Sequence, residues 1–382
     1  MNTIKNKKIA IIGGGPGGLT LARLLQLKGA DVTVYERDLH QDARAQGATL
    51  DLHEESGLAA LQAAGLMDEF KANYRPGADK MRVTDERANI MLDEHASEQD
   101  EIYRNRPEID RGPLQKLLLN SLKPGTVVWD SQFVSLEPLN NGWIIEFKNG
   151  TMATANLVIA ADGANSKLRP YITPVKPFYC GYTAVEGAVY HSEKVIPKMH
   201  KLLSGGKIFA MGDNRSLIVS AKGDGSLGFY PCFKTGERWV KECGIDFTDK
   251  TQVLAWFKTE FSNWGDAWLE LFENATGAFV PRPLYSMPLD QTWDAQPNLT
   301  MLGDAAHLMP PYAGEGVNMA MLDALELSRA LTDESYPDTL SAISAFENQM
   351  RIRASEAADQ SIQSLEILHS PGAIDFMLRI AG

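Results

Sequence analysis

The chain has 382 residues, 44% of them hydrophobic, which is enough to build a large core in two or three structural units. Its formal net charge of -12 argues against nucleic acid and anionic membrane as partners, and no apolar run approaches the ~20 residues of a spanning helix. Three cysteines without a C-x-x-C pair, and no leader-like N-terminal run, predict reduced thiols and a cytoplasmic location. No metal site is expected, because no histidines pair at metal-ligand spacing.

The first element is an apolar strand over 8–12 that runs into a cluster of glycines. Gly13, Gly15 and Gly18 fill a G-x-G-x-x-G frame, and a helix pattern opens directly after them. Gly13 permits the tight turn, Gly15 lets a pyrophosphate approach the backbone, and Gly18 lets the helix pack closely on the strand. The frame predicts that phosphates lie at the N-terminus of the following helix.

A second strand over 31–35 ends at Glu36. This acid stands at about the spacing of a carboxylate that binds a ribose hydroxyl. The alternative is a glycine-rich turn in an ordinary α/β protein with a surface glutamate. Because strand, glycines, helix, strand and acid occur in order, dinucleotide binding is the favoured interpretation.

The rest of the chain shows several further periodic segments. The patterns predict helices over 54–70 (with a stop at Gly65), 114–119 and 338–368, and strands over 126–129, 143–147, 157–161 and 300–302. Lys71 to Glu101 is charged with weak periodicity, and 173–284 is rich in short strand-like runs.

These segments predict an α/β fold: a Rossmann-like nucleotide-binding domain in separate pieces, an inserted, mainly β substrate domain and a long C-terminal helix. The predicted boundaries are 1–72, 94–172 and 285–330 for the nucleotide-binding domain, 73–93 and 173–284 for the substrate domain, and 331–382 for a bridging C-terminal helix.

Three more motifs follow the predicted strands. They are Ala161-Asp162-Gly163-Ala164-Asn165-Ser166, Gly303-Asp304-Ala305-Ala306-His307 and Pro310-Pro311-Tyr312-Ala313-Gly314-Glu315-Gly316-Val317-Asn318. With the glycine loop, this set resembles the single-component FAD-dependent monooxygenases of the aromatic hydroxylase group. Within that group the chain looks most like the tetracycline-inactivating monooxygenases (tetracycline destructases), over nearly its full length and including Gly47-Ala48-Thr49-Leu50-Asp51-Leu52-His53.

The resemblance implies a reaction in which the protein positions and desolvates while the cofactor does the chemistry. NADPH would reduce FAD, and O2 would form a C4a-hydroperoxyflavin that hydroxylates a phenolic or enolic aromatic or polycyclic substrate. No catalytic side chain is expected, although Arg37 would assist hydride delivery. The single glycine frame fits NADPH that visits and leaves, and it also fits an oxidase that needs no nicotinamide. Two alternatives remain: a hydroxylase of another small aromatic metabolite, and a non-catalytic flavin protein that binds a ligand. The protein is expected to be a monomer.

The resemblance also assigns positions in the cofactor site. Glu36 would hold the adenosine ribose, Arg111 the ribityl or phosphate part, and Asp304 the ribityl hydroxyls. Asp162 and Gly163 would shape the pyrophosphate side and the approach of the nicotinamide. The full cofactor set is Gly13, Gly15, Gly18, Glu36, Arg37, Asp51, Arg111, Asp162, Gly163, Gly303, Asp304, Pro311, Gly314, Gly316, Val317 and Asn318. Alternatively, Asp304 is a helix N-cap, Asp162-Gly163 a plain turn and Arg111 a solvated charge at a helix start.

The helix after Gly316 would aim its positive end at the reduced flavin, which is anionic at N1. Glu315 departs from the glutamine that the family commonly has there. A carboxylate facing that anion would oppose it, so the Glu315 side chain is expected to point away.

The substrate positions are less well matched. Glu186, Lys207 and Gly228 correspond to a Gln, an Arg and a His that contact substrate in the tetracycline-inactivating enzymes. Lys207 keeps a positive charge without the fork of arginine, while Gly228 has no side chain. Tyr312 would line a pocket for a flat polyketide or phenol. All of these could instead be ordinary β-surface or core residues.

Overall fold

A computed structural model describes residues 4–43, 49–96 and 106–381. The chain forms two compact units, each assembled from three segments. The first unit comprises Met1–Tyr74, Arg111–Phe178 and Ser286–Ser361, and the second comprises Arg75–Asp110, Tyr179–Tyr285 and Ile362–Gly382. Residues 94–96 and 106–110, expected with the nucleotide-binding segments, thus fall in the second unit, and residues 331–361 fall in the first.

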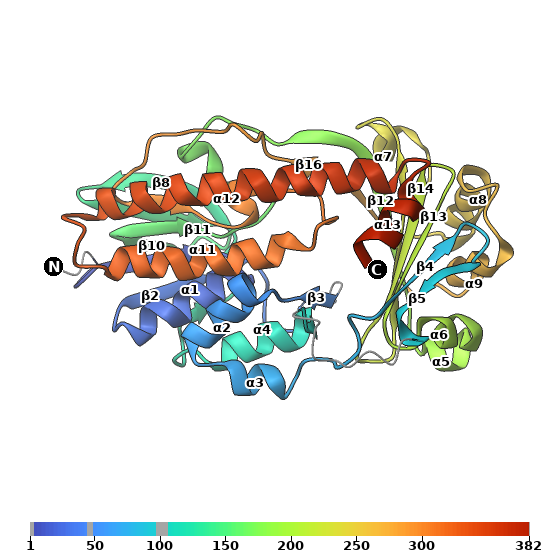
Figure 1. The fold of residues 1–382 in the computed structure, drawn as a ribbon. Helices are drawn as coiled ribbons and strands as arrows, with labels where there is room; N and C mark the ends of the chain where they lie inside the picture. The colour runs from blue at the N-terminus through green and yellow to red at the C-terminus, as the bar shows by residue number, and fades with distance from the viewer. Residues whose placement is uncertain (1–3, 44–48, 97–105, 382) are drawn as a thin grey trace. The chain divides into compact units, whose positions relative to one another are not determined.

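The first unit is built on a parallel five-stranded sheet (Figure 1). In spatial order its strands are Leu299–Met301 (β17), Leu157–Ala160 (β11), Lys8–Ile12 (β1), Asp31–Tyr35 (β2) and Val127–Val128 (β7). Every residue of β11 is buried, as expected for a parallel strand covered on both faces. The predicted α/β class is confirmed, with its Rossmann-like part, its mainly β part and its long C-terminal helix.

Helices α1 (Pro16–Leu27) and α11 (Glu315–Thr332) pack against each other in this unit (Figure 1). A Cβ on Gly17 of α1 would lie 2.9 Å from the Ala320 carbonyl oxygen, so only glycine permits this approach. The other helices with residues in the unit are Ala59–Ala64 (α2), Met67–Lys71 (α3), Arg111–Asn120 (α4), Asp304–His307 (α10) and Thr339–Leu368 (α12), of which α12 runs on into the second unit. The predicted helix over 338–368 is therefore confirmed.

The segment predicted as one helix over 54–70 is broken into three pieces. A π-helical turn spans Glu54–Leu58, α2 ends at Gly65 in the left-handed region (φ 71°), and α3 follows. The predicted stop at Gly65 is confirmed, because a residue in the left-handed region ends an α-helix, and the segment beyond it forms the separate helix α3.

A three-stranded antiparallel sheet also belongs to the first unit. In order, its strands are Met152–Ala155 (β10), Gly142–Phe147 (β9) and Phe133–Leu139 (β8), and a short strand, Thr49–Asp51 (β3), stands elsewhere in the unit. Sequence reasoning missed β8, whose alternation is interrupted by Pro138. Proline is tolerated there because β8 is an edge strand.

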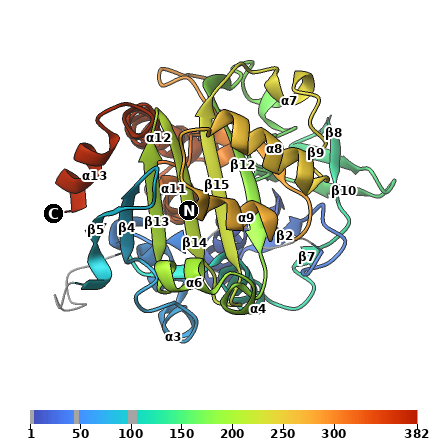
Figure 2. The same ribbon diagram turned by 90° about the vertical axis from the view of Figure 1, so that its right-hand side faces the viewer.

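The second unit contains a seven-stranded sheet (Figure 2). Its strands in order are Val280–Ser286 (β16), Phe178–Val189 (β12), Leu227–Lys234 (β15), Arg215–Ala221 (β14), Lys207–Gly212 (β13), Met81–Asp85 (β4) and Ile90–Asp93 (β5). β4 and β5 arise from the charged stretch in which the sequence predicted no element. Both lie at one side of the sheet, where charged side chains are tolerated.

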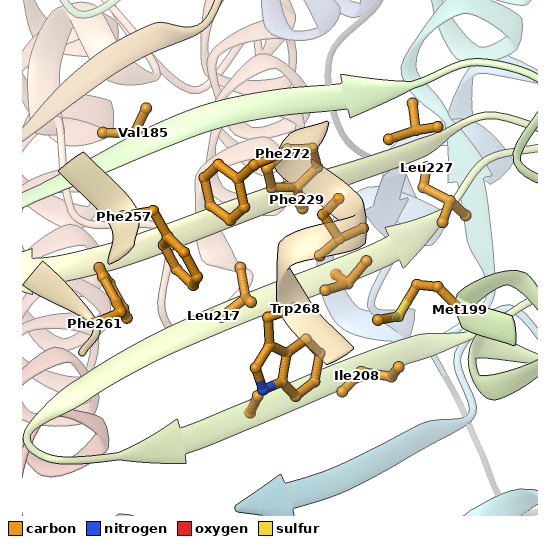
Figure 3. Packing of buried hydrophobic residues seen from close by; sticks show 14 of the residues in the cluster. Val185, Met199, Ile208, Leu217, Leu227, Phe229, Phe257, Phe261, Trp268 and Phe272 are labelled. Atoms are coloured by element: carbon orange, nitrogen blue, oxygen red, sulfur yellow. The ribbon is translucent and has the colours of Figure 1, made fainter. Parts of the chain in front are cut away.

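Helices Lys250–Glu260 (α8) and Leu269–Glu273 (α9) cover one face of this sheet (Figures 1 and 2). A cluster rich in aromatic residues, formed by side chains of these helices and of the sheet, includes Phe257 and Phe272, whose ring centroids are 4.0 Å apart (Figure 3). Trp268 is fully buried there, and its indole N–H donates to the Glu86 carbonyl at 2.9 Å. The unit also contains the strand Glu108–Asp110 (β6) and the α-helices Ser192–Val195 (α5), Pro197–Leu203 (α6), Trp239–Glu242 (α7) and Ala373–Ala381 (α13).

No disulfide links the three cysteines, all of which lie within the described part of the chain. No helix among the described residues has the length and apolar character needed to cross a membrane. In the same residues, no group of three or more His, Cys, Asp or Glu side chains is arranged to hold a metal ion.

Candidate cofactor site

Four of the predicted motifs lie at one edge of the parallel sheet. Gly13 directly follows β1, Glu36 follows β2, Asp162 comes two residues after β11, and Gly303 comes two residues after β17. Because these strands are parallel, their carboxyl ends share this edge. β1 lies between β2 and β11, so the chain order reverses there, which is where open α/β sheets bind ligands.

The structure restricts the three glycine positions of the loop in different ways. Gly13 has φ 115°, and a Cβ there would lie 2.2 Å from the Ala161 oxygen. A Cβ on Gly18 would lie 2.2 Å from the Gly13 oxygen, so the fold itself requires both residues. Gly15 has φ -76°, and its Cβ would meet nothing within 4 Å. The protein therefore leaves open space at Gly15, which fits the close approach of a pyrophosphate.

Glu36 is buried and ties its own strand end to the glycine loop. Its Oε2 accepts the Gly14 N–H at 2.6 Å, and its Oε1 accepts the Asp38 N–H at 3.0 Å. The carboxylate thus stands beside the glycine loop. Arg37, the next residue, is exposed.

Asp162 has one satisfied and one unsatisfied oxygen. Oδ2 accepts the backbone N–H of Lys167 at 2.7 Å, whereas Oδ1 is buried without a hydrogen-bond partner among the described residues. Gly163 has φ 80°, and its carbonyl accepts from Ser166 at 2.9 Å, so the segment is also the turn that the alternative interpretation expected. A buried lone acceptor fits a bound group that supplies a hydroxyl or N–H.

Asp304 is the first residue of α10, and Gly303 (φ 59°) occupies the N-cap position. The Asp304 carboxylate makes no capping bond and accepts no hydrogen bond from the described residues. Burial raises the pKa of Asp304, while the neighbouring His307, Arg111 and Arg169 act to lower it. A half-buried carboxylate that accepts no hydrogen bond from the described residues and has cations nearby fits a ligand with several hydroxyl groups.

Two arginines act near Asp304. Arg111 is exposed at the start of α4, which matches the helix-start alternative, and its charge also acts on Asp304. Arg169 is buried and was missed by sequence reasoning. Its guanidinium donates to the Ala305 carbonyl at 2.7 Å and the Asp304 carbonyl at 2.9 Å, and also to the Ala164 carbonyl at 3.1 Å. It therefore links the loops after β11 and β17.

A buried ion pair lies behind the Gly303 turn. Asp323 of α11 accepts the Gly303 N–H at 3.0 Å and contacts His307 Nε2 at 2.5 Å. Burial lowers the pKa of His307, but the Asp323 carboxylate outweighs it and the pKa is raised. The only sequence signal for this pair was a polar residue within the apolar pattern of α11.

Asn318 joins the start of α11 to the segment after β3. Its Oδ1 accepts the His53 N–H at 2.9 Å and the Ser56 hydroxyl at 3.2 Å. Its Nδ2 donates to the carbonyls of Asp51 at 2.9 Å and Gly314 at 3.1 Å. Since Asn318 is fully buried, this network fixes the backbone of both segments.

The other predicted residues of this stretch surround the same helix start. Gly314 has φ 71°, and its Cβ would lie 2.9 Å from Asp51 Oδ2. Tyr312, Gly316 and Val317 are half-buried, while Pro311 is exposed. Gly47 and Ala48 of the upstream motif lie outside the described residues.

The predicted substrate positions of the second unit share one sheet face. Lys207 and Gly228 are both in register with Ser220, so they stand in one cross-strand row, opposite the face that carries the aromatic cluster. Lys207 is ion-paired with the buried Glu108. Glu186 Oε2 accepts from Arg282 through Nε at 3.0 Å and through a terminal nitrogen at 2.8 Å. Tyr312 belongs to the other unit.

Comparison with known proteins matches the FAD binding domain family to residues 6–176 and 291–339. The chain is 27% identical to the monooxygenase asqM of Emericella nidulans, covering 98% of both chains. It is 28% identical to a 3-amino-4-hydroxybenzoate 2-monooxygenase of Streptomyces platensis, covering 85% of this chain and 79% of that protein. The tetracycline destructase Tet(55) has the same fold, with a TM-score of 0.76, 18% identity and coverage of 98% and 94%.

The sheet edge, the glycine loop and the matched segments together define a flavin-dependent oxidoreductase. The chain belongs to the FAD binding domain family, and it is a single-component FAD-dependent monooxygenase of the aromatic hydroxylase group. The resemblance stated from its sequence is confirmed at this level.

Proposed function

We propose that the enzyme uses NADPH and O2 to insert one oxygen atom into an electron-rich carbon of a phenolic or enolic aromatic or polycyclic substrate. The observation that carries the proposal is the meeting of four strand-end motifs, with an unengaged Asp304 carboxylate and a buried acceptor on Asp162. Bound FAD would supply the activation of O2. We infer a cytoplasmic location from the cysteine pattern, and we propose a monomer as the resemblance suggests.

We propose these roles for the chain's own residues. Gly15 leaves room for the pyrophosphate, and Glu36 holds the adenosine ribose beside the loop. Asp304 accepts ribityl hydroxyls, with Arg111 supplying a nearby positive charge. The first N–H groups of α11 stabilise negative charge on the reduced flavin ring, because an N-terminal turn leaves them without helical partners.

The sheet face of the second unit supports an aromatic substrate. Phe209, Ile218 and Tyr230 form the cross-strand row next to that of Lys207 and Gly228. The charges of Glu186 and Lys207 are already paired with Arg282 and Glu108, so these two side chains are balanced within the protein. The named relative that acts on an aminohydroxybenzoate supports a phenolic substrate, and tetracyclines remain a candidate class from the resemblance.

The test measures NADPH oxidation by the FAD-loaded enzyme with tetracycline, an aminohydroxybenzoate and simple phenols under oxygen-18 gas. We expect at least one product to gain a single labelled oxygen. Label that comes from water instead, or NADPH consumption that yields only hydrogen peroxide with every compound, would contradict the proposed substrate class. A substrate hydroxylated with NADH but not with NADPH would contradict the proposed reductant.

A further inference from the structure

His53 is a buried histidine held between two carboxylates of the first unit. It follows β3, and only 3% of its side chain is exposed. Its Nε2 lies 3.1 Å from Asp51 Oδ2, and its Nδ1 lies 3.4 Å from Glu315 Oε1. Asp51 is the last residue of β3 and Glu315 is the first of α11, so the ring bridges two elements that are far apart in the chain.

Only the charged ring satisfies this arrangement. A neutral imidazole has one N–H, so one of its nitrogens would turn a lone pair towards a carboxylate oxygen, whereas imidazolium donates from both nitrogens. Burial lowers the pKa of His53, but its contacts with Asp51 and Glu315 outweigh burial and raise the pKa to about 9. The two glutamates on the following turn, Glu54 and Glu55, are exposed.

The bridge also accounts for Glu315. A carboxylate at the first position of α11 stands where the helix presents its positive end, and left alone it would repel an anionic ligand at that end. In the structure the carboxylate turns to His53, and Asn318 fixes the same two segments through their backbones. The positive charge of His53 thereby offsets one of the two negative charges at this helix start within the protein.

We propose that His53 is a positioning residue of the cofactor site: as a cation between Asp51 and Glu315, it joins the end of β3 to the start of α11 and neutralises a carboxylate that would repel anionic cofactor. The inference rests on the proposed assignment of the α11 start to FAD. It extends that assignment to a residue that sequence reasoning left out of the site.

The first test measures FAD affinity by fluorescence titration of the full chain near neutral pH. Replacing His53 by glutamine leaves two carboxylates without their cation, and we expect FAD to bind about tenfold more weakly, equal to about 1.4 kcal/mol. Adding Glu315→Gln to His53→Gln should restore affinity to within about threefold of the wild type, because it removes one of the two charges. His200→Gln serves as the control, since the His200 ring also contacts a polar side chain, the Ser192 hydroxyl, but has no carboxylate partner among the described residues and lies in the second unit.

The second test is independent of FAD and of turnover. An NMR titration of the apoprotein should show the His53 ring protonated at neutral pH and titrating near pH 9. A ring that titrates near its ordinary value of about 6.5 would overturn the proposal, as would a double variant no better than His53→Gln. If the wild-type enzyme hydroxylates none of the compounds with NADPH, while the FAD titration and the NMR titration give the expected results, the proposed function is refuted and this inference stands.

Discussion

Substitution of Gly15 separates cofactor binding from folding. Gly15 has φ -76° and ψ 176°, an extended conformation that any residue adopts, and a Cβ there would meet nothing within 4 Å. Gly18 differs, because a Cβ there would lie 2.2 Å from the Gly13 carbonyl oxygen. Gly15→Val should therefore fold normally, while Gly18→Ala should not.

The magnitudes follow from that geometry. For Gly15→Val we expect the free energy of unfolding of the apoprotein to change by less than about 1 kcal/mol, since the gain from a less flexible unfolded chain offsets a poorer helix cap. The side chain fills the space assigned to the pyrophosphate, so FAD affinity should fall at least about 100-fold, or about 2.7 kcal/mol. Gly18→Ala must displace backbone and should lose about 3 kcal/mol or more of stability.

The assay combines urea unfolding of the apoproteins, followed by tryptophan fluorescence, with FAD titration of the folded variants. Gly236→Val is the matched control, because Gly236 also has open space around its Cβ and no left-handed φ, but belongs to the second unit. A folded Gly15→Val variant with wild-type FAD affinity would refute the assignment of the pyrophosphate to this loop. If Gly15→Val proves as unstable as Gly18→Ala, the conclusion that there is open space around the Gly15 Cβ position is refuted.

Three further results are expected. Asp304→Ala should weaken FAD binding by about 1–3 kcal/mol, because it removes hydrogen bonds to the cofactor and leaves its space open; equilibrium dialysis checks this, and unchanged affinity would contradict it. Trp268→Ala should lower the free energy of unfolding by about 3–5 kcal/mol, since Trp268 is fully buried in the aromatic cluster; in urea unfolding, a loss below about 1 kcal/mol would be inconsistent with that packing. Burial lowers the pKa of His369 to about 4, so the unfolded chain takes up its proton first as pH falls from about 6.5, and up to about 3 kcal/mol of stability is lost by pH 4. His369→Gln should flatten the urea-unfolding profile across that window, and a slope equal to that of the wild type would count against a buried neutral ring.

The sequence by itself determined the local geometry of the nucleotide-binding part. The strands over 8–12 and 31–35 and the long helix near 338–368 occur where the patterns predicted them. The reason is that glycine spacing, apolar alternation and helical periodicity act over a few residues, and local backbone preferences decide them. The roles of the predicted cofactor residues stay predictions, although the structure gives a steric reason for the glycine at 13 and again at 18.

Only the tertiary structure decided which charged and polar side chains meet. The local sequence pattern gave no signal for three of these contacts. They are the ion pair of Lys207 with Glu108, the hydrogen bonds by which Arg169 joins two loops, and the contact of His53 with Glu315. Each joins segments separated by many residues, so its partner depends on how distant elements pack. A buried charge must find a counter-charge or hydrogen-bond partners in space, because desolvation otherwise makes its burial too costly, and the chain's fold alone determines which groups come within reach.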